Sequence, residues 1–76
     1  MMDELLEILE ELHPDVDFET ETGLISNGIL DSFDIVTLAA EIDARIGVSV
    51  PAEELLPENF NSAKAIYALI ERLQEE

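Results

Sequence analysis

The residues of this chain whose types and spacing best suit a chemical role are a serine and two nearby aspartates, Asp31, Ser32 and Asp34. Asp31 is a preferred residue for a helix N-cap, because its carboxylate can accept a hydrogen bond from a free backbone N–H in the first turn. Asp34 lies three positions later, where it can complete a short form of the capping box and where its charge suits the positive end of the helix dipole. The spacing therefore predicts a helix that begins at Ser32. The start of this helix is expected to expose the serine hydroxyl beside unpaired backbone N–H groups, which can stabilise a phosphate ester.

The segment around this serine also carries a family resemblance. Gly28–Asp34 resembles the attachment site of acyl carrier proteins and peptidyl carrier proteins, and the resemblance extends through Val50–Glu54 to the closing helix. In that family, the serine that matches Ser32 carries 4′-phosphopantetheine, derived from coenzyme A, through a phosphodiester. The thiol of this cofactor then holds an acyl or aminoacyl group as a thioester.

The resemblance implies a role for each residue of the motif. Ser32 would be the attachment point, while Asp31 and Asp34 would shape the helix start and offer charge to the modifying enzyme, a phosphopantetheinyl transferase. The motif departs from that of fatty-acid carriers at Phe33, where leucine is more common, and this leaves the cargo open. The competing interpretation is a plain capped helix, since Asp-Ser pairs begin many helices. The position of the motif, mid-chain after a long loop, favours the carrier.

Composition limits the classes of protein to which the chain can belong. Its 76 residues allow one domain, residues 1–76, and its 47% hydrophobic content is too high for a disordered chain. The chain has no cysteine, so it has no disulfide and no thiol nucleophile, and thioester chemistry would need an imported thiol. No apolar run is long enough to span a membrane, and the acidic N-terminus does not resemble a signal peptide. We expect a soluble, cytoplasmic protein without membrane insertion.

Charge is the strongest compositional signal. Nineteen acidic residues against three basic ones give a formal net charge of −16. Such a field repels nucleic acid and steers the molecule towards basic patches on protein partners. The expected partners are acyl- or aminoacyl-loading and condensing enzymes with basic docking patches, and we expect a monomer that does not bind nucleic acid.

Hydrophobic periodicity predicts a first helix from an N-cap at Asp3 to Leu12, ended by Pro14. Its buried face is expected to contain Leu5, Leu6, Leu9 and Leu12, with Ile8 at the border. His13, the only histidine, is expected to complement the dipole at the helix end. The irregular segment that follows does not fit a calcium-binding EF-hand loop, and no metal site is predicted. The apolar residues expected to anchor it to the core are Val16, Phe18, Leu24, Ile25 and Ile29.

The helix that begins at Ser32 is expected to run to about Ile46, where Gly47 stops it, and it carries two apolar stripes. The inward stripe consists of Ile35, Leu38, Ala39, Ile42 and Ile46. The second stripe is interpreted as a partner-binding face, in keeping with the way carrier proteins present this helix to their enzymes. The residues assigned to this face are Phe33, Val36, Thr37, Ala40, Asp43 and Ala44. An alternative places Phe33 in the core against the preceding loop.

The remaining chain predicts an extended linker at residues 48–50, a short helical turn at residues 52–56 and a second turn at residues 57–60. Leu55 and Phe60 are expected to point inward. A last helix is capped by Asn61 or Ser62 and buries Ile66, Leu69, Ile70 and Leu73. The predicted fold is therefore all-α, a small four-helix bundle of three main helices and a short third helix, with a long first loop.

These features predict an acyl carrier protein that serves fatty acid or related biosynthesis. The alternative is a discrete aminoacyl carrier of the D-alanyl or peptidyl type. A cofactor-free acidic helical adaptor is less favoured, because relatives of that kind commonly lack the serine. An enzyme is least favoured, since the sequence offers no catalytic constellation.

Overall fold

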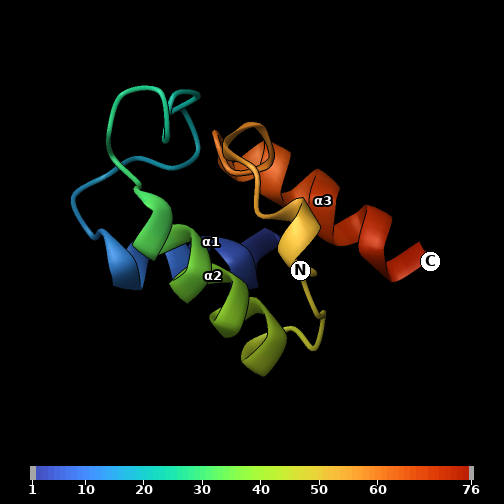
Figure 1. Ribbon diagram of the computed structural model, residues 1–76. Helices are drawn as coiled ribbons and strands as arrows, with labels where there is room; N and C mark the ends of the chain where they lie inside the picture. The colour runs from blue at the N-terminus through green and yellow to red at the C-terminus, as the bar shows by residue number, and fades with distance from the viewer. Residues whose placement is uncertain (1, 76) are drawn as a thin grey trace.

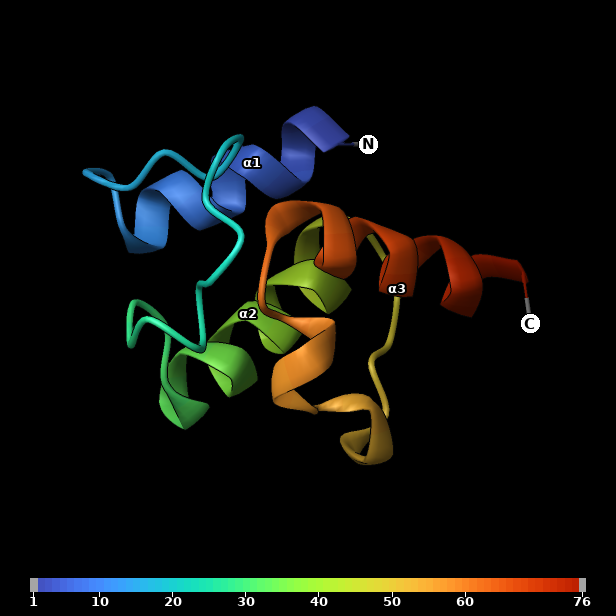
Figure 2. The same cartoon turned by 90° about the horizontal axis from the view of Figure 1, so that it is seen from above.

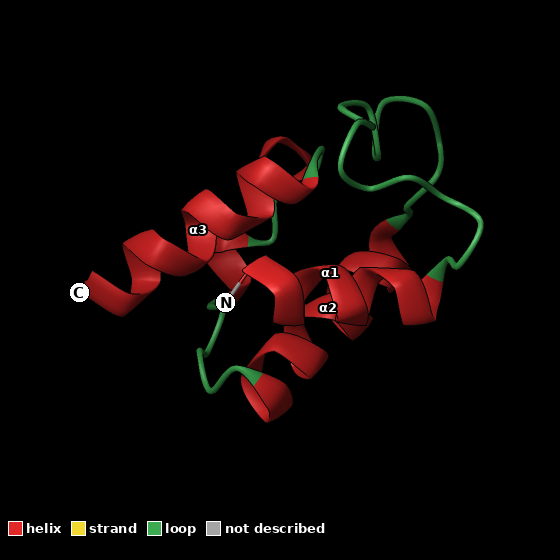
Figure 3. Ribbon diagram, turned by 180° about the vertical axis from the view of Figure 1, so that it is seen from behind, coloured by secondary structure: helices red, strands yellow, loops and turns green. Residues whose placement is uncertain are grey.

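The computed structural model describes residues 2–75, and within this range all regular structure is helical. The three α-helices are α1 (Met2–Leu12), α2 (Ser32–Arg45) and α3 (Ala63–Glu75), and two 3₁₀ turns, η1 (Ala52–Glu54) and η2 (Pro57–Asn59), lie between α2 and α3. Figure 3 shows these helices joined by loops, with no strand in the described part of the chain. The predicted all-α fold is confirmed.

The short third helix of the predicted bundle consists of the two 3₁₀ turns. Pro57 divides them, because proline lacks a backbone N–H and pushes the preceding residue out of helical geometry. Leu56 is accordingly extended, with φ −108° and ψ 143°. Arg72 of α3 holds this segment in place by donating hydrogen bonds of 3.1 and 3.2 Å to the two carboxylate oxygens of Glu54.

The arrangement of the helices follows from what each one packs against. α1 contacts both α2 and α3, and α3 also contacts η2. In Figures 1 and 2, the loop formed by residues 13–31 extends from one end of the α1–α2 pair, and the two 3₁₀ turns lie beside α2 and α3. The start of α2 therefore stands where this loop returns to the bundle.

A single apolar cluster fills the space between these elements. Ile8 was predicted to border the buried face of α1 but is 1% exposed, because α1 is covered by α2 on one side and by α3 on another. Leu6 and Leu12, which were predicted to be buried, lie half-buried at the edge. The buried residues are Leu5, Ile8, Leu9, Phe18, Leu24, Leu30, Ile35, Leu38, Ile42, Val48, Phe60, Ala63, Ile66, Leu69 and Ile70.

The first loop is fixed to this core. Phe18 and Leu24 are buried, as predicted, and the other predicted anchors, Val16, Ile25 and Ile29, are partly buried against the core. The Leu24 N–H donates to the carbonyl oxygen of Asn61 at 2.8 Å, and the Leu30 N–H donates to the carbonyl oxygen of Leu24 at 2.8 Å. These bonds fix the path of the loop up to the start of α2.

The helix ends differ from the predictions by one or two residues. α1 begins at Met2, so Asp3 lies in its first turn instead of at the N-cap. α2 ends at Arg45, and Gly47, with φ 84°, donates its N–H to the carbonyl oxygens of Ile42 and Asp43. The left-handed φ makes glycine the favoured residue at this terminus.

Candidate functional site

The start of α2 is closed by a reciprocal capping box. Asp31 is extended, with φ −117° and ψ −174°, and its Oδ1 accepts a hydrogen bond of 2.9 Å from the Asp34 N–H. Asp34 Oδ2 in turn accepts a bond of 3.3 Å from the Asp31 N–H. The predicted cap is confirmed, and both carboxylates take part in it. Two backbone N–H groups at the helix start are thereby satisfied by side chains.

Ser32 lies between these two residues, at the first position of α2, and is exposed. Within residues 2–75, no hydrogen bond of its hydroxyl is found, whereas each of the other three serine hydroxyls is bonded. Ser26 Oγ accepts from Asn61 Nδ2, Ser49 Oγ donates to Asp43 Oδ1, and Ser62 Oγ accepts from the Ala65 N–H. The Ser32 hydroxyl is therefore accessible and has no structural role.

A small open hollow adjoins Ser32. It has a volume of about 150 Å³ and is lined by Ser32, Ile35 and Val36 from α2 and by Leu55 and Pro57 from the 3₁₀ segment. Pockets that enclose a drug-sized ligand have about 300–1,000 Å³. The hollow can therefore shelter a small group beside the serine.

The structure also brings His13 to the helix start, which sequence reasoning did not predict. His13 Nε2 lies 3.2 Å from Asp34 Oδ2. His13 directly follows the last residue of α1, and its side chain also contacts the beginning of α2. The two residues are 21 positions apart, so no local pattern in the sequence could have revealed the contact.

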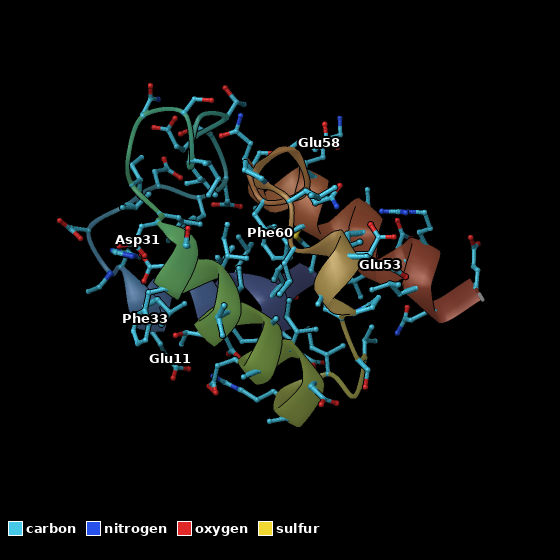
Figure 4. All side chains as sticks on the ribbon, viewed as in Figure 1. Glu11, Asp31, Phe33, Glu53, Glu58 and Phe60 are labelled. Atoms are coloured by element: carbon cyan, nitrogen blue, oxygen red, sulfur yellow. The ribbon has the colours of Figure 1, made fainter. Side chains whose placement is uncertain are left out.

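The outer side of α2 is apolar and exposed near the serine. Phe33 is 76% exposed and Val36 is 56% exposed. The alternative that placed Phe33 in the core is therefore wrong. Figure 4 shows Phe33 with Asp31 at the start of α2, while Phe60 lies between α2 and α3. The other residues predicted for this face are exposed at Ala40, Asp43 and Ala44 and half-buried at Thr37.

Leu56 extends this apolar character beyond α2 and was not predicted to do so. It is 41% exposed and lies between Leu55 and Pro57, which line the hollow opposite Val36. A signal was present in the sequence, because the residue before a proline is pushed out of helical geometry, and the helical turn predicted over residues 52–56 ends before Leu56.

The chain is similar to a known family over most of its length. A family model described as "Phosphopantetheine attachment site" matches residues 2–70. The chain belongs to this family. It is a carrier protein, and the cofactor of its family is covalently attached 4′-phosphopantetheine. A carrier works together with enzymes that modify and load it.

Two D-alanyl carrier proteins are similar to this chain over most of its length. The D-alanyl carrier protein of Streptococcus suis (strain 05ZYH33) is 36% identical over 63 residues, which cover 82% of this chain and 80% of the relative. The D-alanyl carrier protein of Streptococcus suis (strain 98HAH33) is 35% identical over 63 residues, with the same shares of both chains covered.

The residues at the start of α2 suit a phosphopantetheine carrier. A phosphodiester needs an accessible hydroxyl, and the Ser32 hydroxyl is exposed and free of other bonds within residues 2–75. The two neighbouring carboxylates could repel a phosphate, but both accept hydrogen bonds within the capping box. When bound, the cofactor supplies the thiol that the cysteine-free chain lacks.

None of the helices within residues 2–75 has the length and apolar character needed to cross a membrane.

Proposed function

We propose that this protein is a discrete aminoacyl carrier that holds a D-alanyl group as a thioester on a 4′-phosphopantetheine arm attached to Ser32. The observation that carries the proposal is the free Ser32 hydroxyl at a capped helix start, within a chain that the family model matches over residues 2–70. The other serine hydroxyls all take part in hydrogen bonds, which supports Ser32 over them.

Two observations support a D-alanyl cargo over a fatty acyl cargo. The two relatives are D-alanyl carrier proteins. Phe33, which is exposed on the outer face of α2, stands where leucine is more common in fatty-acid carriers.

The chemical contribution of the chain is to present one hydroxyl. Attachment forms a bond between Ser32 Oγ and the phosphorus of 4′-phosphopantetheine, releases the serine proton, and expels adenosine 3′,5′-bisphosphate from coenzyme A. Asp31 and Asp34 hold the helix start on either side of this hydroxyl. The tethered thioester then reaches partner enzymes at a high effective concentration, so the carrier accelerates transfer by proximity.

The proposed partners are a phosphopantetheinyl transferase and an enzyme that activates D-alanine with ATP. We propose that they dock on the outer face of α2 around Phe33 and Val36, and that residues 1–76 act as one carrier domain. The net charge of −16 favours partners with basic surroundings at this contact.

Modification is tested by incubating the chain with coenzyme A and a phosphopantetheinyl transferase and then measuring the intact mass. We expect one phosphopantetheine per chain, located on Ser32 by peptide mapping. Ser32→Ala should abolish it, and Ser62→Ala is the matched control that should retain it. The absence of modification, or modification at Ser26, Ser49 or Ser62, would refute the assignment.

The cargo is tested on the modified protein. With ATP and a D-alanine-activating enzyme, we expect a D-alanyl thioester that hydroxylamine releases, and little product with L-alanine. In a parallel reaction, a malonyl or fatty acyl transferase should load the protein poorly. Efficient acyl loading without D-alanine loading would show that the protein is an acyl carrier and would refute the D-alanyl cargo.

A further inference from the structure

We infer that His13 is a positioning residue for the serine at the start of α2, acting through Asp34. This inference rests on the proposed attachment at Ser32. It assigns a role in modification to a residue outside the attachment motif, at the end of a different helix.

The position of the His13 ring follows from the backbone that carries it. The His13 N–H donates to the carbonyl oxygen of Leu9 at 2.9 Å, and its own carbonyl oxygen accepts from the Val16 N–H at 3.2 Å. Both backbone groups are thus fixed to the end of α1 and to the first turn of the loop. The side chain is 30% exposed and therefore partly held by its surroundings.

The contact with Asp34 has a defined donor. A carboxylate only accepts hydrogen bonds, so His13 Nε2 must carry the hydrogen that it donates to Asp34 Oδ2 over 3.2 Å. The same Oδ2 atom accepts from the Asp31 N–H at 3.3 Å. Asp34 Oδ2 therefore joins α1 to the capping box of α2.

This connection closes the first loop at its base. The loop begins at His13 and ends at Asp31, and the His13–Asp34 bond brings these two ends together. Among the described residues, the His13–Asp34 bond is the side-chain hydrogen bond that links the capping box to the end of α1. Ser32 lies between the two residues of that box, so its backbone is fixed on both sides.

The expected consequence concerns the rate of transfer to the serine. Without the His13 donor, the Asp34 carboxylate, which is 21% exposed, can turn to water, and its bond to the Asp31 N–H is weakened. The serine hydroxyl then occupies more positions, and transfer requires it in line with the phosphorus. Docking should be little affected, because the exposed Val36 side chain lies beyond the capping box and remains in place.

The experiment measures kcat and KM of a phosphopantetheinyl transferase with coenzyme A and three variants of the full chain. His13→Ala should lower kcat by about three- to tenfold, as expected from the loss of one hydrogen bond. KM for the carrier should stay within about twofold of wild type, because an interaction needed only in the transition state affects kcat. His13→Gln keeps a side-chain N–H donor and should restore most of the rate.

Arg45→Gln is the matched control. Arg45 also joins α1 to α2, by donating a hydrogen bond of 2.7 Å to Glu11, but it lies at the other end of α2 from Ser32. Its removal should loosen the same pair of helices and leave kcat unchanged. An equal loss of kcat in Arg45→Gln and His13→Ala would reduce His13 to a general stabilising residue and overturn the inference.

A second measurement does not depend on the transferase. In ¹⁵N NMR spectra of the wild-type protein, the His13 ring should carry a proton on Nε2, and His13→Ala should shift the amide resonance of Asp31. A ring protonated only on Nδ1, or a His13→Ala variant with wild-type kcat, would also overturn the inference. Failure of the wild-type protein to be modified at all would instead refute the proposed function.

Discussion

Asp31 and Ser32 are adjacent in the chain and have opposite roles at the start of α2. Asp31 Oδ1 accepts the Asp34 N–H at 2.9 Å, whereas Ser32 is exposed and no hydrogen bond of its hydroxyl is found within residues 2–75. The cap and the reactive group are thus held by separate side chains. This separation lets the hydroxyl be modified without loss of the cap.

Substitutions at these positions should reveal the difference. Asp31→Ala should lower the free energy of unfolding by about 1 kcal/mol, the usual effect of losing an N-cap. Asp31→Asn keeps a side-chain oxygen and should lose less. Ser32→Ala should stay within about 0.5 kcal/mol of wild type, as surface substitutions usually do. Urea denaturation measures all three, and a Ser32→Ala variant as unstable as Asp31→Ala would contradict the separation of roles.

Asn61 and Ser62, the two residues predicted as alternative caps of α3, have different roles. Ser62 caps α3, since its Oγ accepts the Ala65 N–H at 3.0 Å. Asn61 Oδ1 instead accepts from the backbone N–H groups of Ile25 and Ser26, at 2.8 and 3.1 Å. Asn61 is therefore the side chain that fastens the first loop to the start of α3.

Removing this side chain should be costly. Asn61→Ala leaves two backbone N–H groups of the loop without acceptors, and an unsatisfied donor costs about 1–3 kcal/mol where water cannot replace the bond. Asn61→Asp retains the acceptor oxygens and should lose less stability. Urea denaturation provides the comparison, with Asn59→Ala as a control at another partly buried asparagine. Equal stability of Asn61→Ala and wild type would show that water replaces these bonds.

At the scale of elements, α2 has one side that belongs to the core and one that does not. Ile35, Leu38 and Ile42 are buried, and Phe33 and Val36 are exposed on the other side. The two stripes recognised in the sequence are therefore confirmed as an inner and an outer face. Docking of enzymes on the outer face remains a prediction.

A pair of lysine substitutions tests both faces of α2. Val36→Lys should change the free energy of unfolding by less than about 1 kcal/mol, since the side chain is 56% exposed, while loading by partner enzymes should fall sharply. Ile42→Lys places an unpaired charge in the core and should cost about 3–5 kcal/mol or prevent folding. Thermal melts and a loading assay on both variants provide the readouts. Normal loading of Val36→Lys would remove this residue from the docking surface.

The elements also show which interactions a sequence reveals. The cap of α2, its inner stripe and its end at Gly47 were predictable, because each depends on residues within a few positions of one another. The burial of Ile8, the His13–Asp34 contact and the role of Asn61 were not. They arise where helices and loops distant in sequence meet, and a local pattern contains no information about the partner.

At the scale of the whole molecule, the excess of carboxylates is the dominant electrostatic feature. The described residues extend over 31 × 23 × 18 Å, which is about two to four Debye lengths of about 8 Å in 0.15 M salt. With a formal net charge of −16, many carboxylates therefore lie within one Debye length of another. Arg45 and Arg72 are both engaged in ion pairs, with Glu11 and Glu54. The hydrogen bond that Arg45 donates to Glu11 raises the pKa of the Arg45 guanidinium above its usual value.

Added salt should therefore stabilise the protein. Screening weakens the repulsion among carboxylates more than it weakens the few attractive pairs, so Tm should rise with sodium chloride and more steeply with magnesium chloride. No cluster of three or more metal-ligating side chains is found within residues 2–75, so we expect a gradual rise without saturation at a single site. Thermal melts in both salts measure the effect. A Tm that does not respond to either salt would show that self-repulsion is unimportant.

The attachment of the first loop to Asn61 has a consequence for hydrogen exchange. A loop of this length would ordinarily open on its own, and its amides would exchange quickly. Here the amides of Leu24 and Ile25 donate to the carbonyl and side-chain oxygens of Asn61, next to the cap of α3. These amides should consequently exchange at the same rate as the hydrogen-bonded amides of Ala65 and Ile66 at the start of α3, as one cooperative unit that opens together. A loading enzyme that displaced the loop before Ser32 would then also disturb the start of α3.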